Sequence, residues 1–309
     1  MADDYLAISD FVADALDVAQ TGINDLLQQA PLVATLPRIG SGDGGTTHKY
    51  NKYTGAPVVG FRAESDGREH VSSADTVISV SMKILDFSWT VDVAVADAWR
   101  RGGAEALIAR EGARHLASAL AKLEAQVFYG TGTGGDSAGF TGFMNNTALD
   151  ALSDALVIDA GGSTATTASS CYAVRWGSDD VAVVTSDTIS LGETVVQRVA
   201  GATGWYPAYF TPASLWVGLQ QGGIYSVGRI ANLTEDSGKG LTDDLIAALL
   251  AEMPYTPNAL VMSRRSRRQL QQSRTATNPT GAPAPFPMEA FGVPIIVSEQ
   301  LLNTEAIET

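Results

Sequence analysis

The sequence contains little cysteine, little charge and no long apolar run. Its 309 residues include a single cysteine, Cys171, which excludes a disulfide framework and a cysteine-rich zinc site. No stretch reaches the about 18 consecutive apolar residues that a membrane-spanning helix needs. The first residues, Met1 to Asp4, are acidic where a secretory signal peptide carries basic residues, so we expect no signal peptide.

Charged residues make up 17% of the chain, whereas an ordinary soluble protein has roughly 25%. The 20 Lys and Arg residues against 34 Asp and Glu residues give a net charge of −14, which argues against non-specific nucleic-acid binding by the whole surface. Two interpretations fit the sparse charge. Neighbouring subunits cover much of the surface, as in obligate assemblies, or the chain is an Ala- and Gly-rich globule.

Motifs for metal or nucleotide binding are weak. The three histidines, His48, His70 and His115, include no pair at metal-ligand spacing, and we expect neither a metal nor a cofactor. The glycines at 130, 132 and 135 match the dinucleotide fingerprint, but a predicted helix precedes them. That order presents the wrong end of the helix dipole to a phosphate.

One motif leaves an enzymatic alternative open. The segment 135–139 fits G-x-S-x-G around Ser137, with His48 and Asp92 or Asp97 upstream in the order of trypsin-like proteases. A helix, where the nucleophile elbow requires a strand, is predicted before it, and the preceding chain is too short for two barrels. A serine hydrolase that uses Ser137 is the alternative from a different functional class.

Hydrophobic spacing predicts the main elements. Leu116, Leu120, Leu123 and Val127 form one stripe of a long helix over 103–129, with Gly130 as its C-terminal cap. Further helices are expected at 4–30, 241–253 (capped by Thr242) and 263–273. Strands are expected at 46–54, 76–97, 171–176, 181–185, 194–199, 215–230 with turns, 259–262 and 293–297.

Residues 40–75 are polar and hold too few large apolar side chains to bury a core of their own. We interpret this segment as a long β-hairpin or extended loop that reaches away from the body and lies on a neighbouring subunit. A disordered surface loop is the alternative.

A basic cluster is formed by Arg264, Arg265, Arg267 and Arg268. At helical spacing these side chains fan around the helix. They therefore belong either to a solvated helix that pairs with acidic neighbours or to an inward-facing patch that contacts packaged nucleic acid.

The order of these elements, together with local sequence, resembles the major capsid proteins of tailed bacteriophages. The segments that carry the resemblance are 124–142, 170–177, 226–232, 291–297 and 303–305. The resemblance implies an α+β chain with the Hong Kong 97 phage coat fold. Its expected parts are an N-terminal arm (1–39), an extended loop (40–80), a peripheral domain (81–145) with spine helix 103–129, an axial domain with β-rich insertions (146–290), and a C-terminal strand (291–309) that returns to the peripheral domain.

The same resemblance implies a non-enzymatic subunit of the virion, assembled in the bacterial cytoplasm as pentamers and hexamers of an icosahedral shell. Expected partners are other copies of the chain, a scaffolding protein, a portal, a cement protein and double-stranded DNA bound without sequence specificity, and no membrane. An encapsulin-like compartment is an alternative. Because no long charged helical segment precedes the arm, we expect a separate or already removed scaffold. Expected inter-subunit contacts are Lys49, Tyr50, Tyr53, Arg62 and Arg68.

Overall fold

The computed structural model describes residues 28–41, 46–55, 57–69, 71–100, 102–186, 190–223, 225–278 and 282–308. The helix predicted over 4–30 lies outside the described residues except for 28–30, which form a turn. That turn leads into the short helix α3 (Pro31–Thr35), which has a proline at its start.

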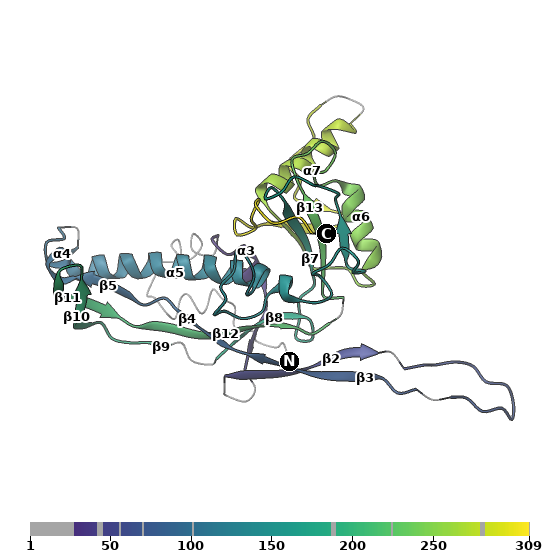
Figure 1. Ribbon diagram of the computed structural model, residues 1–309, viewed down its shortest axis with the longest axis horizontal. Helices are drawn as coiled ribbons and strands as arrows, with labels where there is room; N and C mark the ends of the chain where they lie inside the picture. The colour runs from purple at the N-terminus through teal and green to yellow at the C-terminus, as the bar shows by residue number, and fades with distance from the viewer. Residues whose placement is uncertain are drawn as a thin grey trace.

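The centre of the molecule is a long helix lying along a sheet (Figure 1). Helix α5 (Gly103–Tyr129) has the predicted bounds, and its predicted apolar stripe is buried. The sheet runs in the order β1 (Arg38–Gly40), β8 (Val181–Thr185), β12 (Ala213–Gln221) and β4 (Lys83–Asp86), and β9 (Ser190–Leu191) also pairs with β12. Strand β1 is parallel to β8, and the other pairings are antiparallel.

A three-stranded sheet lies at one end of α5, in the order β10 (Val195–Gly201), β11 (Gly204–Thr211) and β5 (Trp89–Asp92). The strand prediction for 76–97 is wrong at its end, because Val93–Asp97 forms helix α4. The Asp92 carboxylate accepts a hydrogen bond from Ala94 N at 2.8 Å and so caps this helix. The cap outweighs the alternation of valines that predicted a strand.

A second lobe contains a six-stranded sheet in the order β15 (Glu289–Ala290), β16 (Val293–Val297), β14 (Ala259–Met262), β7 (Ser169–Val174), β13 (Val227–Leu233) and β6 (Val157–Asp159). Strands β7, β13 and β14 are buried along their whole length. Helices α6 (Asp243–Glu252) and α7 (Arg264–Ala276) lie in the same lobe (Figure 1). The predicted cap is present, since Thr242 Oγ1 accepts from Leu245 N.

The C-terminal part of the chain contacts both lobes. Strand β16 pairs in parallel with β14 inside the six-stranded sheet. The chain after the strand lies against the end of α5, and the assignment of 291–309 to a peripheral domain stays a prediction. The Tyr129 hydroxyl donates to Glu305 Oε1 at 2.6 Å and accepts from Leu302 N at 2.7 Å, which joins this segment to the end of α5.

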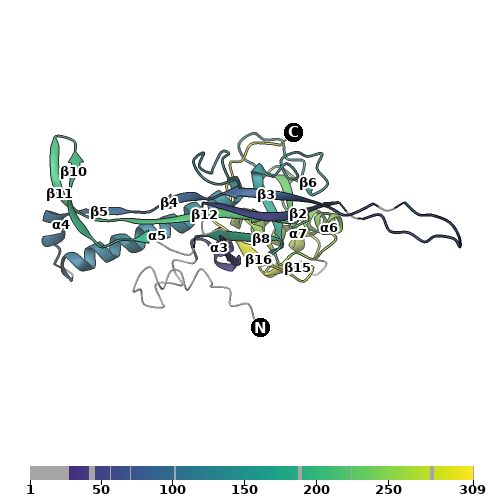
Figure 2. The same ribbon diagram turned by 90° about the horizontal axis from the view of Figure 1, so that it is seen from below.

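A long hairpin leaves the body, as the composition of 40–75 predicts. Strand β2 (Thr47–Gly55) pairs antiparallel with β3 (Ala74–Ser81), and Val58 bridges Val71 further out. Figures 1 and 2 show the hairpin reaching well past the second lobe, at the opposite end of the molecule from β10 and β11. The subunit is therefore elongated, with a β-hairpin at each end.

Candidate assembly surfaces

The tip of the β2–β3 hairpin is an exposed apolar surface, which we call the hairpin tip (residues 57–69 and 71). Val59 is 80% exposed and Phe61 is fully exposed. Arg62 donates to Asp66 O at 3.2 Å, and Arg68 donates to Gly60 O at 3.3 Å, so both guanidinium groups hold the backbone of the tip itself. The tip is shaped by its own polar contacts while its apolar side chains remain uncovered by the described chain.

The base of the hairpin is fastened to β12. The Tyr50 hydroxyl donates to Gln221 O at 3.1 Å, and His48 Nε2 lies 2.9 Å from Gln220 Oε1. Burial raises the pKa of Tyr50. Tyr50, one of the predicted inter-subunit contacts, thus anchors the hairpin to β12 of its own subunit. Lys49 beside it is exposed. The side chain of Tyr53 lies outside the described residues.

A second exposed apolar surface lies at the opposite end, on β10 and β11. Val195, Val196 and Trp205 are exposed, and the Arg198 guanidinium lies 5.4 Å from the centre of the Trp205 ring. The sequence predicts a strand here but not its exposed apolar face, because alternation alone does not say which face of a strand is covered.

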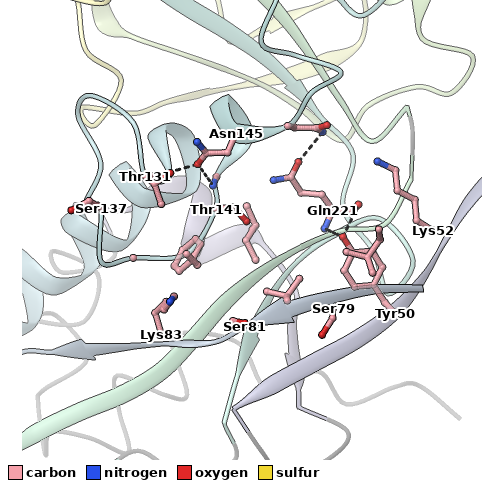
Figure 3. A pocket seen from close by; sticks show the side chains of 17 residues that line it. Tyr50, Lys52, Ser79, Ser81, Lys83, Thr131, Ser137, Thr141, Asn145 and Gln221 are labelled. Carbon is pink, nitrogen blue, oxygen red and sulfur yellow. Dashed lines mark hydrogen bonds between the residues drawn. The ribbon is translucent and has the colours of Figure 1, made fainter. Parts of the chain in front are cut away.

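A cleft of about 480 Å³, lined by both polar and apolar side chains, lies between the base of the hairpin and the loop that follows α5 (Figure 3). We call it the lysine cleft. Its polar lining comes from four separate segments of the chain: Tyr50 and Lys52 on β2, Ser79 to Lys83 on β3 and β4, Thr131 to Asn146 after α5, and Gln221 at the end of β12.

Ser137 lines this cleft but is not part of a triad. His48 is bound to Gln220, and Asp92 caps α4 at the far end of the molecule. Helix α5 precedes the glycine loop, as predicted, so the loop meets the C-terminal end of the helix. Within the described ranges no three His, Cys, Asp or Glu residues are grouped to hold a metal. Nor does any helix there combine the length and apolarity needed to cross a bilayer.

The basic cluster on α7 is occupied by partners within the chain. Arg264 and Arg268 form ion pairs with Glu299 and Glu235, respectively. Arg265 donates to Thr167 O at 2.8 Å and to Leu233 O at 2.9 Å, and Arg267 donates to Pro287 O at 2.7 Å. These contacts fit the solvated, ion-pairing alternative for this helix. The contact of the cluster with DNA stays a prediction.

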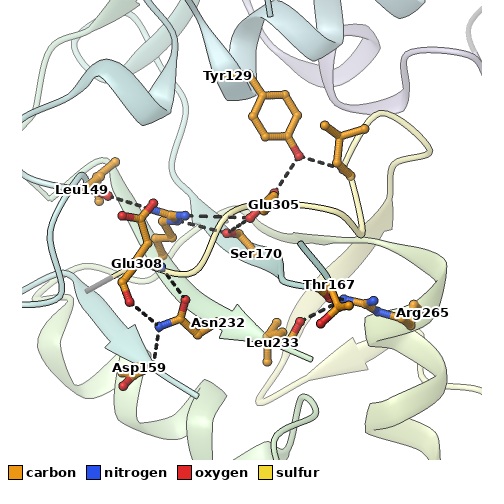
Figure 4. A network of polar contacts seen from close by, with 12 residues as sticks. Tyr129, Leu149, Asp159, Thr167, Ser170, Asn232, Leu233, Arg265, Glu305 and Glu308 are labelled. Atoms are coloured by element: carbon orange, nitrogen blue, oxygen red, sulfur yellow. Dashed lines mark hydrogen bonds and ion pairs between the residues drawn. The ribbon is translucent and has the colours of Figure 1, made fainter. Parts of the chain in front are cut away.

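A buried ionic network holds the C-terminal segment in the second lobe (Figure 4). Arg229 is 1% exposed and pairs with Glu308 at 3.0 Å and with Glu305 at 3.8 Å. Ser170 Oγ accepts from Arg229 Nε at 3.0 Å and donates to Glu305 Oε2 at 2.6 Å. Burial raises the pKa of Glu305, and burial together with the Glu305 charge raises that of Tyr129. Sequence reasoning missed this network because its members lie far apart in the chain.

A second buried carboxyl group, Glu124 on α5, joins three segments. It accepts hydrogen bonds from Leu32 N at 2.8 Å, from Val33 N at 3.2 Å and from the Ser298 hydroxyl. Burial raises the pKa of Glu124 to about 7. One side chain therefore fastens α3, α5 and the chain after β16 to one another.

Known proteins resemble this chain over nearly its whole length. A family model described as major capsid protein GP7 matches residues 17–307. The structure of bacteriophage epsilon15 shares 20% identity over 88% of this chain and 87% of its own, with a TM-score of 0.62. The bacteriophage JBD30 capsid shares 12% identity over 94% of this chain and 97% of its own, with a TM-score of 0.51. No curated protein sequence matches the chain.

The two structural likenesses establish the fold, and the family match establishes the relationship. The fold observed is the α+β phage capsid fold that the order of elements predicted. The family assignment also removes the hydrolase alternative, in agreement with the scattered positions of Ser137, His48 and Asp92. The chain belongs to the major capsid protein GP7 family and is a structural, non-enzymatic component of a tailed-bacteriophage capsid.

Proposed function

We propose that this capsid protein assembles as pentamers and hexamers that close an icosahedral shell around double-stranded DNA. The observation that carries the proposal is the hairpin tip, where Val59 and Phe61 are exposed although each would be stabilised by burial. A segment of this kind gains most of its stabilisation from another copy of the chain. Lys49, Tyr53, Arg62 and Arg68 are the polar side chains that we assign to the same inter-subunit contact.

The two ends of the subunit support a closed assembly. The hairpin tip and the β10–β11 surface differ in sequence and lie at opposite ends (Figure 2). Contacts between unlike patches are heterologous, and heterologous contacts form rings or shells when the rotation closes. Several modest contacts per subunit then add through multivalency.

The further partners in this proposal follow the capsid role. A separate scaffolding protein and a portal act during assembly in the host cytoplasm, and a cement protein binds outside. The packaged DNA is held without sequence specificity, and the α7 cluster of Arg264, Arg265, Arg267 and Arg268 is the candidate surface for contact with it. A structure that resembles this chain, the JBD30 capsid decorated with minor capsid protein trimers, has a TM-score of 0.50 at 13% identity over 86% of this chain and 88% of its own.

The test is a double variant at the hairpin tip, Val59→Ser with Phe61→Ser. Because these side chains are exposed in the subunit, we expect wild-type thermal stability together with at least a tenfold loss of shell-sized particles, counted by negative-stain microscopy and sedimentation. Phe143→Ser, which alters a fully buried ring, is the contrasting control and should lower both stability and particle yield. Wild-type particle yield from the double variant would contradict the proposal.

A further inference from the structure

The lysine cleft carries cationic groups and no acidic group, in a chain where acidic residues outnumber basic ones 34 to 20. Lys52 and Lys83 stand on opposite sides of the space in Figure 3, and none of the 17 lining residues is Asp or Glu. Neither lysine takes part in an ion pair with the described part of the chain. Two ammonium groups thus face the cleft without a counter-charge.

The amide of Asn145 adds a donor to the cleft. Its oxygen accepts hydrogen bonds from two backbone N–H groups, those of Thr131 at 2.9 Å and Gly142 at 3.1 Å. Backbone N–H groups can only donate, so they fix which end of the amide is the oxygen. The amide nitrogen of Asn145, a group with two donor hydrogens, has no hydrogen-bond acceptor among the described residues.

Two successive hydrogen bonds also fix the orientation of the Gln221 amide, with its oxygen bound inside the subunit. Ala148 N donates to Asn146 Oδ1 at 3.2 Å, which fixes the Asn146 amide. Asn146 Nδ2 then donates to Gln221 Oε1 at 3.0 Å. The Gln221 oxygen is thereby occupied, and its amide nitrogen has no acceptor among the described residues. In both amides the oxygen is thus used internally, while hydroxyl groups of the lining, such as those of Ser79, Ser81 and Thr141, can donate as well as accept.

We propose that the lysine cleft binds the carboxylates of an acidic peptide segment, and that residues 1–27 of this chain are that segment. Charge-assisted hydrogen bonds to a carboxylate satisfy ammonium and amide donors together. Residues 1–27 contain no Lys, Arg or His and six aspartates, which are Asp3, Asp4, Asp10, Asp14, Asp17 and Asp25.

The segment is long enough to reach the cleft. Leu32 is held by Glu124, which lies five residues, or about 8 Å of helix, before the end of α5 at Tyr129. Thr131, which lines the cleft, follows two residues after that end. Twenty-seven extended residues span up to about 90 Å, so the segment reaches the cleft of its own subunit or of a second copy. A nucleic-acid strand fits less well, because its phosphates would approach a subunit of net charge −14.

Zero-length cross-linking of the unassembled full chain with a carbodiimide tests the proposal. The reagent takes up one water as an aspartate carboxylate and a lysine Nζ condense to an amide, and peptide mass spectrometry locates the bond. We expect residues 1–27 to be joined to Lys52 or Lys83, and not to Lys239 in the second lobe. Mixing isotopically labelled with unlabelled subunits assigns the bond to one chain or to two. Cross-links confined to other lysines would overturn the proposal.

A binding measurement gives a second readout. We expect a fluorescent peptide of residues 1–27 to bind the full chain, with affinity lowered about tenfold or more by Lys52→Gln with Lys83→Gln and lowered by added salt. Lys239→Gln is the matched control for charge and should leave the affinity unchanged.

Equal affinity of the double variant, or of a peptide whose six aspartates are asparagines, would overturn the proposal. Tighter binding of a single-stranded oligonucleotide at these lysines would assign the cleft to nucleic acid instead. Both measurements use unassembled subunits, so their outcome is independent of whether the chain forms an icosahedral shell.

Discussion

Glu124 shows what one buried side chain does in this subunit. It is fully buried, contacts α3 and Ser298, and has a pKa of about 7 instead of its usual value near 4.5. A carboxyl group whose pKa is higher in the folded than in the unfolded chain binds its proton more tightly when folded. Its contribution to the free energy of unfolding is therefore full below about pH 4.5 and is lost as the pH rises through about 7.

We predict that Glu124→Gln removes this dependence. Because glutamine does not titrate, the free energy of unfolding of the variant should rise relative to wild type by up to about 3 kcal/mol between pH 4.5 and 8. Urea denaturation of unassembled subunits across this range measures the difference. Glu111→Gln, which removes a carboxylate paired with Arg114 on the surface of the same helix, is the matched control. A difference between wild type and Glu124→Gln that is constant with pH would contradict the assignment.

At the scale of elements, α5 is positioned by close packing against β5. The Trp89 ring lies over Gly112, where an added Cβ would come within 2.8 Å of Trp89 Cζ2. We predict that Gly112→Ala destabilises the subunit by about 1 kcal/mol, because overpacking of about 1–3 kcal/mol exceeds the helix propensity gained. Thermal or urea unfolding measures the change.

Gly67→Ala is the control for this substitution, since an added Cβ there meets no atom within 4 Å. It should change the free energy of unfolding by less than about 0.5 kcal/mol. A Gly112→Ala subunit that is more stable than wild type would show that the Trp89 ring moves aside at little cost.

The elements differ in how far the sequence predicts them. Helix α5 is predicted to its end residues because its apolar stripe is long and Gly130 follows at once, with a positive φ of 53°. Helix α4 is missed because five residues are too few to show a repeating pattern of apolar residues at helical spacing. The Asp92 cap is a side-chain contact that the strand alternation of the valines concealed. The pairing of β16 with β14 is not readable either, since non-local pairing depends on the whole sheet.

The lysine cleft shows why a binding site of this kind cannot be predicted from the sequence. Lys52, Lys83, Asn145 and Gln221 come from four segments, and only the fold brings them together. Ser137, which a motif singles out, lines the same cleft without a catalytic partner. Local sequence predicts local chemistry, whereas this site is made by tertiary contacts.

At the scale of the whole molecule, the two unlike ends give a prediction about mixtures. A subunit with Val59→Ser and Phe61→Ser keeps its β10–β11 surface and so can still occupy a place in a growing shell. We predict that adding such subunits to wild type lowers the particle yield by more than their share of the mixture, measured by sedimentation.

The control for the mixture carries Trp205→Ser in addition, so that both ends are altered. Such subunits should be excluded from the shell and should lower the yield only in proportion to their share. Proportional loss with the single-end variant as well would mean that the hairpin tip and the β10–β11 surface do not act as separate contacts.

The network around Arg229 has a consequence for synthesis on the ribosome. Strand β16 and both carboxylates that pair with Arg229 lie within the residues from 293 to 308, so they are among the last described parts of the chain to be translated. Until they emerge, the guanidinium group has no counter-ion and the sheet lacks the neighbour of β14. A product that ends before residue 293 is therefore left with an open strand edge at β14 and an uncompensated charge at Arg229.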